Sequence, residues 1–264
     1  MRETIIILII LVFTFTIKAQ IDNDTLKEQE LPVILWSNNT AKTLKKGRKE
    51  VGIFSPLKFG LKDSMELSIH PLLFFIIPNI ELKKYWTSFG IFDLASKHKI
   101  SYPTLLYNVI SKRGIGGILP ETSIIPQMFK FNNAVIIGTT INEYLTTTVN
   151  VGLDLTLSFG ESSFPEIEYH IIYPRTYSYN NLFTPYFGVN FTGIVFGKLF
   201  YEYNFTAFFM TNEYEGSILE NKLKFQWNVS DKFAIKGGAL LSYGQYPFGE
   251  GGGLFPVFDL MYGF

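Results

Sequence analysis

The feature of this chain that most constrains its fold is a two-residue alternation of apolar and polar side chains. From Tyr144 to Phe159, one face carries mainly Leu and Val, beginning at Leu145 and ending at Phe159. The other face carries Thr146, Thr148, Asn150, Gly152, Asp154, Thr156 and Ser158. Successive side chains of a β-strand point to opposite sides of the sheet, so this pattern predicts a strand with one apolar and one polar face.

The same alternation recurs in segments that begin near Met65, Phe183, Leu199, Leu223 and Phe233. Two kinds of connection separate the segments. Short polar connections lie at 61–64, 141–144 and 228–232, and long ones at 104–133, 160–181 and 244–253. Short turns at one end and long loops at the other are typical of outer-membrane barrels.

About eleven strands are recognisable after Arg48, and bacterial single-chain barrels have even strand numbers. We therefore predict twelve strands, with ten as the next choice. The uncertain segments are 31–44, 166–173 and a break near Gly90.

The predicted fold class is all-β, a transmembrane antiparallel up-and-down β-barrel. The alternative is a secreted β-sandwich, whose strands also alternate because one face packs inward. Two observations favour the barrel: the polar faces carry full charges, and the chain has 26 Phe and 15 Tyr, more than one sandwich core would absorb. In hydrocarbon every backbone N–H and C=O must be paired internally, so only helices and closed barrels cross a membrane.

The N-terminus has the composition of a signal peptide. Arg2 precedes an uncharged run over 4–17, and Ala19 offers a small residue for cleavage. We expect a signal peptide at 1–19, a periplasmic lead-in at 20–47 and an outer-membrane barrel domain at 48–264. The chain contains no cysteine, which excludes lipid anchoring, disulfides and thiolate metal sites.

The last residues form an aromatic strand pattern, with Phe258, Leu260, Tyr262 and Phe264 on one face. This pattern resembles the C-terminal insertion signal read by the outer-membrane barrel assembly machinery. The segment 40–72 resembles the opening of porin-like barrels of Bacteroidota and related bacteria. The resemblance implies a location in the bacterial outer membrane, with membrane lipid and the assembly machinery as partners.

Motifs that would indicate enzymatic chemistry or a cofactor are weak. His70, His98 and His170 have no short metal-binding spacing, and Ser68 and His70 alone do not make a catalytic triad. The glycine-rich stretch at 112–121 matches no phosphate-binding loop and is interpreted as a loop bent into the barrel mouth. The 23 basic and 23 acidic residues balance, which argues against a nucleic-acid partner. We expect no cofactor, no metal and no enzymatic activity.

Charged side chains on the polar strand faces are the candidate functional residues. The candidates for lining the lumen are Glu66, His70, Asp154, Glu202, Glu220, Lys222, Lys224, Lys232, Lys236 and Asp259. The four lysines after position 220 form either a positive patch or ion pairs with Glu202, Glu220 and Asp259.

Three functions are compatible with this pattern. The first is a passive channel or uptake pore for small solutes. The second is a non-conducting structural or accessory barrel subunit of an envelope assembly, secretion or transport complex, with an unknown partner. The third is an outer-membrane lipid-modifying enzyme, which requires a Ser–His contact at the membrane face.

Overall fold

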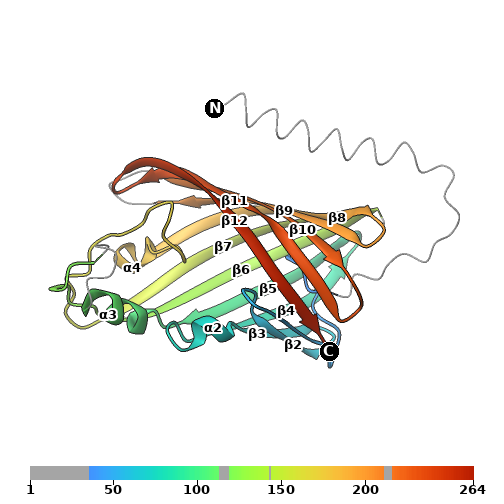
Figure 1. Ribbon diagram of the computed structural model, residues 1–264, viewed down its shortest axis with the longest axis horizontal. Helices are drawn as coiled ribbons and strands as arrows, with labels where there is room; N and C mark the ends of the chain where they lie inside the picture. The colour runs from blue at the N-terminus through green and yellow to red at the C-terminus, as the bar shows by residue number, and fades with distance from the viewer. Residues whose placement is uncertain (1–35, 113–118, 143, 211–215) are drawn as a thin grey trace, which may run out of the picture. The chain divides into compact units, whose positions relative to one another are not determined.

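The computed structural model describes residues 36–112, 119–142, 144–210 and 216–264, and within them the chain forms a closed antiparallel β-barrel of twelve strands (Figure 1). Each strand pairs with its neighbours in sequence, and β12 returns to pair with β1. The strands are β1 (Lys49–Gly52), β2 (Leu57–Lys62), β3 (Met65–Ile69), β4 (Asn79–Phe89), β5 (Phe92–Ser101), β6 (Gln127–Asn142), β7 (Leu145–Phe159), β8 (Phe183–Phe196), β9 (Leu199–Phe209), β10 (Ser217–Asn228), β11 (Phe233–Tyr246) and β12 (Gly249–Gly263).

The prediction of an all-β barrel with twelve strands is confirmed. Gly90 lies in the turn between β4 and β5, at a φ of 60° that favours glycine. The segment 166–173 and the described residues of 31–44 form no strand.

The two-residue alternation decides which side chains point inward. In β7, Thr148, Asp154 and Thr156 are buried, whereas Val151 and Phe159 are exposed. Most positions of the other strands follow the same rule, so charged groups gather in the interior and large apolar residues cover most of the outside. This is the inverse of a soluble protein and matches a barrel surrounded by lipid.

Connections of different length lie at the two ends of the barrel. The turns β2–β3, β4–β5, β6–β7, β8–β9 and β10–β11 are short and share one end. Three connections at the other end contain the short helices α2 (Pro71–Phe74), α3 (Thr104–Lys112) and α4 (Ser178–Asn181). None of the helices in the described ranges has the length and apolar character needed to cross a bilayer.

The expected long loop at 244–253 is wrong. β11 and β12 continue through these residues and are joined by a tight turn at Pro247 and Phe248, followed by Gly249 at a φ of 106°. The glycines of this stretch look like a loop in the sequence because they carry no side chain to show the alternation.

Candidate functional site: the occupied barrel lumen

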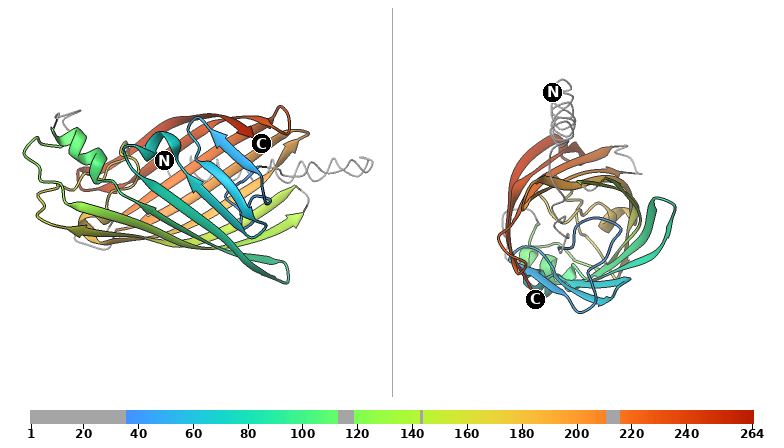
Figure 2. Two further views of the ribbon diagram at one scale, coloured as in Figure 1. Left: turned by 90° about the horizontal axis from the view of Figure 1, so that it is seen from below. Right: turned by 90° about the vertical axis from the view of Figure 1, so that its right-hand side faces the viewer.

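Residues 36–46, here called the plug, lie inside the barrel. Figure 2 (right) shows this dark-blue segment crossing the interior of the ring. Trp36 packs against the inward-facing Ala234 and Met261, and Ala41 packs against Ala95 and Ile136. The plug belongs to the predicted lead-in at 20–47; residues 20–35 of that lead-in, like the signal peptide, lie outside the described residues.

Two buried carboxylates on the short strands hold the plug. Glu50 accepts a hydrogen bond from the backbone N–H of Ser37 at 3.0 Å. Glu66 accepts hydrogen bonds from the Ser37 hydroxyl at 2.9 Å and the Leu44 N–H at 3.0 Å. Lys58 lies 3.7 Å from Glu66 and also donates to the Ser37 hydroxyl. An irregular buried segment needs such acceptors, because an unpaired buried N–H is costly.

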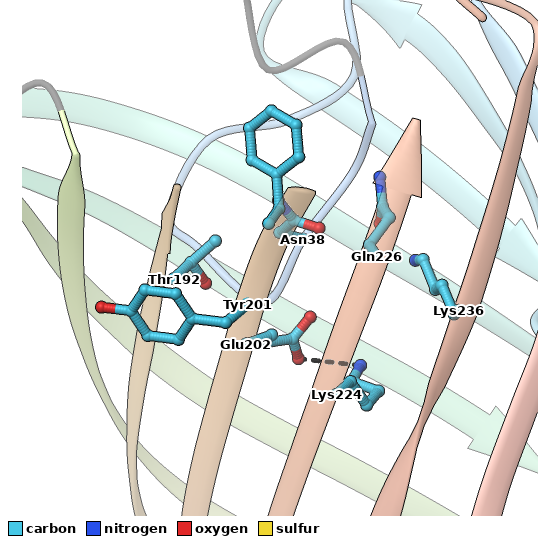
Figure 3. A pocket seen from close by; sticks show the side chains of 8 residues that line it. Asn38, Thr192, Tyr201, Glu202, Lys224, Gln226 and Lys236 are labelled. Carbon is cyan, nitrogen blue, oxygen red and sulfur yellow. Dashed lines mark ion pairs between the residues drawn. The ribbon is translucent and has the colours of Figure 1, made fainter. Parts of the chain in front are cut away.

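The plug also contacts the opposite wall. Asn39 donates to Glu202 at 2.6 Å, and Glu202 pairs with Lys224 at 2.9 Å. A small cavity lies at this contact (Figure 3). It is lined by Asn38, Thr192, Phe200, Tyr201, Glu202, Lys224, Gln226 and Lys236.

At the other end, the connection between β7 and β8, residues 160–182, folds into the barrel; we call it the mouth loop. Its Arg175 donates to Glu168 and to Glu220 of β10, each at 2.6 Å, and to the Ser242 hydroxyl of β11 at 3.1 Å. Burial disfavours the charged guanidinium, but Glu220 and Glu168 outweigh this effect and raise the pKa of Arg175. Arg175 is therefore a permanent cation that ties the loop to the wall.

The third wall contact of the mouth loop comes from β6. Lys130 donates to the backbone carbonyl of Arg175 at 2.7 Å and pairs with Asp154 at 2.7 Å. Asn132 donates to the same Asp154 carboxylate at 2.6 Å. The Asp154 carboxylate thus anchors Lys130, and through it the loop.

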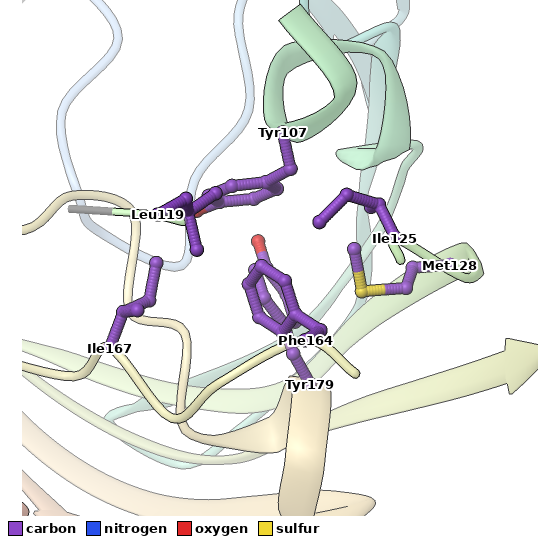
Figure 4. Packing of buried hydrophobic residues seen from close by; sticks show 7 residues of the cluster. All are labelled: Tyr107, Leu119, Ile125, Met128, Phe164, Ile167 and Tyr179. Atoms are coloured by element: carbon purple, nitrogen blue, oxygen red, sulfur yellow. The ribbon is translucent and has the colours of Figure 1, made fainter. Parts of the chain in front are cut away.

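An apolar cluster completes the cover at this end (Figure 4). It comes from α3, the segment after it, the start of β6 and the mouth loop. Its members are Tyr107, Leu119, Ile125, Met128, Phe164, Ile167 and Tyr179. The plug therefore occupies the lumen at one end of the barrel, and the mouth loop with this apolar cluster occupies it at the other. Residues 113–118 of the predicted glycine-rich loop lie outside the described residues.

Several of the candidate lumen residues belong to these contacts. Glu66, Asp154, Glu202 and Glu220 are buried and bonded as described, and Lys224 pairs with Glu202. Lys236 is buried beside the plug. Lys222, on the same face of β10, is half-buried.

The remaining candidates lie in a turn or near the seam, the place where β1 pairs with β12 and closes the barrel. Asp259 is buried and accepts a hydrogen bond from the Phe54 N–H at 3.0 Å. His70 follows β3, and its Nε2 lies 2.9 Å from the Phe54 carbonyl oxygen. Lys232 differs from the expectation: it is exposed in the turn before β11, because the alternation does not continue through a turn.

The aromatic face of β12 points outward. Phe258, Tyr262 and Phe264 are exposed and Leu260 is half-buried, while Asp259 and Met261 are buried between them. The rings of Tyr262 and Phe264 stack at 5.7 Å.

Sequence reasoning missed several residues of the lumen. Glu50 and Lys58 lie on very short strands, and Glu168 and Arg175 lie in a loop without any periodicity. Lys130 lies in "FKFNN", which has the alternation of a strand but falls within the predicted long connection 104–133. The described residues contain no cluster of His, Asp or Glu suited to a metal ion.

Comparison with known proteins adds little. No family model matches the chain, and no curated protein matches it. Among solved structures, the chain is similar to the outer membrane channel DcaP of Acinetobacter baumannii, with 10% sequence identity and a TM-score of 0.38, over 92% of this chain and 69% of that one. At this TM-score the similarity carries no inference about function.

Proposed function

We propose that this protein is a bacterial outer-membrane β-barrel that forms a gated channel for small polar solutes. The observation that carries the proposal is the closed barrel with apolar side chains outside and charged side chains inside. Closure pairs the strand backbones, as hydrocarbon requires, and the charged interior suits water and polar solutes. Export by a signal peptide at 1–19 and insertion by the barrel assembly machinery belong to the same proposal, and a Bacteroidota origin rests on the resemblance of 40–72.

For solutes to pass, the mouth loop has to move at its end of the barrel, and at the opposite end the element that has to move is the plug. It has no regular secondary structure, and the polar contacts that hold it come mainly from Glu50, Glu66 and Glu202. Charge-assisted hydrogen bonds to a short segment can be exchanged for water when the segment leaves the lumen. The wall itself does not need to change.

A second candidate is a non-conducting barrel that serves as a structural or accessory subunit of an envelope complex. It is favoured by the occupation of both ends of the lumen and by the pairing of inward charges, such as Arg175 with Glu168 and Glu220. In that case the plug and the mouth loop are permanent parts of the interior.

A disulfide between the plug and the wall distinguishes the gated channel from the non-conducting barrel. A Cβ built on Gly138 of β6 lies 3.2 Å from the Cβ of Ala41, close to the separation of about 3.5–4.5 Å in disulfides. The chain has no native cysteine, so Ala41→Cys/Gly138→Cys introduces the only thiols. In planar bilayers we expect the reduced double variant to conduct and the oxidised one to be closed, while Ala41→Cys alone conducts under both conditions.

The channel is excluded by one combined result. The variant Glu50→Gln/Glu66→Gln weakens the contacts to Ser37 and Leu44 and favours release of the plug. If neither this variant nor the reduced cysteine variant conducts, the non-conducting barrel replaces the channel.

A further inference from the structure

A group of polar side chains on the outer surface of the barrel, separate from the lumen, has the arrangement of a catalytic triad. In β5 and β6, Ser96, His98 and Asn133 share the outward face with Leu94, Ile100, Val135 and Ile137. His98 and Asn133 are exposed and Ser96 is covered. Polar and ionisable groups on a lipid-facing surface are costly, and where they occur they usually have a function.

The backbone register brings the three side chains together. Ser96 and His98 are two residues apart on one strand and therefore share a face, and His98 is paired directly with Asn133 across the β5–β6 ladder. The imidazole Nε2 lies 3.0 Å from the Ser96 hydroxyl, and Nδ1 lies 2.8 Å from the Asn133 side-chain oxygen.

The hydrogen bonds fix the proton positions. Asn133 Oδ1 is an acceptor only, so Nδ1 of His98 carries the proton and Nε2 is the acceptor for the Ser96 hydroxyl. The indole N–H of Trp86 donates to the same Ser96 oxygen at 2.8 Å. The Ser96 hydroxyl thus donates to His98, which is the arrangement of nucleophile, base and orienting group in serine hydrolases.

Two features of β4 support a reaction at Ser96. Lys84 is paired with Ser96 across the β4–β5 ladder, and its ammonium lies 3.6 Å from the centre of the Trp86 ring. The pairing puts a cation on the strand next to Ser96, and a nearby positive charge stabilises the negative charge that develops during attack on a carbonyl. The ladder also shifts register between Tyr85 and Thr87, which leaves Trp86 at a β-bulge. Bulges of this kind re-aim side chains next to active sites.

We propose that Ser96, His98 and Asn133 form a serine hydrolase triad that cleaves acyl esters of membrane lipids. Ser96 Oγ attacks the ester carbonyl carbon, and its proton passes to His98 Nε2. The tetrahedral intermediate collapses to an acyl-Ser96 ester while His98 gives that proton to the leaving alcohol. Water then attacks the acyl-enzyme, His98 takes its proton and returns it to Ser96, and the fatty acid leaves. The net reaction is an ester and water giving an acid and an alcohol.

This proposal is the lipid-modifying alternative from the sequence, carried by a different pair of residues. In the Ser68–His70 pair, which has the same spacing, His70 Nε2 contacts the Phe54 carbonyl instead, and Ser68 is buried inside the barrel. The Ser–His contact at the outer face lies instead between Ser96 and His98. The proposed hydrolase activity does not depend on conductance through the lumen, because Ser96 and His98 lie on the outer face of the barrel wall.

The test uses the full-length protein in vesicles of phosphatidylethanolamine and phosphatidylglycerol. We expect release of fatty acid and lysophospholipid, and covalent labelling of Ser96 by a fluorophosphonate. Ser96→Ala and His98→Ala should each lower the rate by about a hundredfold or more, and Asn133→Ala by about tenfold or more. Ser68→Ala is the matched control and should retain the wild-type rate.

Two results would overturn the triad: neither hydrolysis nor labelling by the wild-type protein, or equal hydrolysis by wild type and Ser96→Ala. Folding of each variant is checked by its heat-dependent mobility on gels, and Ser96→Cys provides a second, nearly isosteric variant. Conductance of Ser96→Ala should equal that of wild type, so failure of the hydrolase and failure of the channel are separate outcomes.

Discussion

Individual charged residues inside the barrel act as anchors. Arg175 is the best example, because its guanidinium contacts Glu168 of its own loop as well as Glu220 and Ser242 of the wall. The Glu168 carboxylate in turn accepts the N–H groups of Thr176 and Tyr177. A buried carboxylate without its cation is strongly destabilising, so the loop depends on this one side chain.

Replacement of Arg175 by Met should release the mouth loop. It leaves Glu168 and Glu220 buried without a cation, at a cost of about 3–5 kcal/mol. We expect faster proteolysis within 160–182 and a lower unfolding temperature. Lys198→Met, at an exposed lysine in the β8–β9 turn, is the control. Restoration of protection by the added change Glu220→Gln would support the electrostatic origin, and unchanged proteolysis of Arg175→Met would refute it.

At the scale of elements, the strands were predictable and the inserted segments were not. The alternation within a strand such as β7 identifies its two faces, because the lumen favours polar side chains and lipid favours apolar ones. The plug and the mouth loop have no period, and their positions depend on contacts to residues far away in sequence, such as Ser37 to Glu66 and Arg175 to Glu220. Local patterns cannot reveal such contacts. The outward group of Ser96, His98 and Asn133 escapes prediction because Asn133 lies in the predicted long connection 104–133, so its pairing with His98 across two strands is not foreseen.

The point where the plug leaves the barrel can be tested without changing a charge. A Cβ built on Gly60 of β2 lies 2.0 Å from the Lys45 carbonyl oxygen, a backbone atom that cannot simply rotate away. Gly60→Ala should therefore push the Leu44–Lys45 backbone off the wall and speed tryptic cleavage after Lys45 and Lys46, whose side chains are already exposed but whose backbone is held against the wall. Gly237→Ala in β11 is the matched control, since its Cβ meets no atom within 4 Å. Equal cleavage of both variants would show that the plug does not depend on this contact.

At the scale of the whole molecule, closure of the barrel depends on a short seam. β1 pairs with β12 at only three positions, from Met261 to Gly263, whereas β11 and β12 pair over their whole length. The backbone groups of Lys49 and Phe264 extend the seam by exchanging two hydrogen bonds of 2.8 and 2.9 Å. The Lys49 ammonium also lies 5.4 Å from the centre of the Phe264 ring.

Deletion of Phe264 should therefore reduce assembly into the outer membrane, because it removes two backbone hydrogen bonds of the seam together with an aromatic side chain of the outward face. The variant Phe264→Leu separates these effects, since it keeps the backbone and loses the ring. If the ring is the insertion signal, both variants should show a similar loss of heat-modifiable barrel in membrane fractions. If the backbone pairing at the seam is decisive, only the deletion variant should show this loss. Normal assembly of the deletion variant would show that the remaining pairs close the barrel on their own.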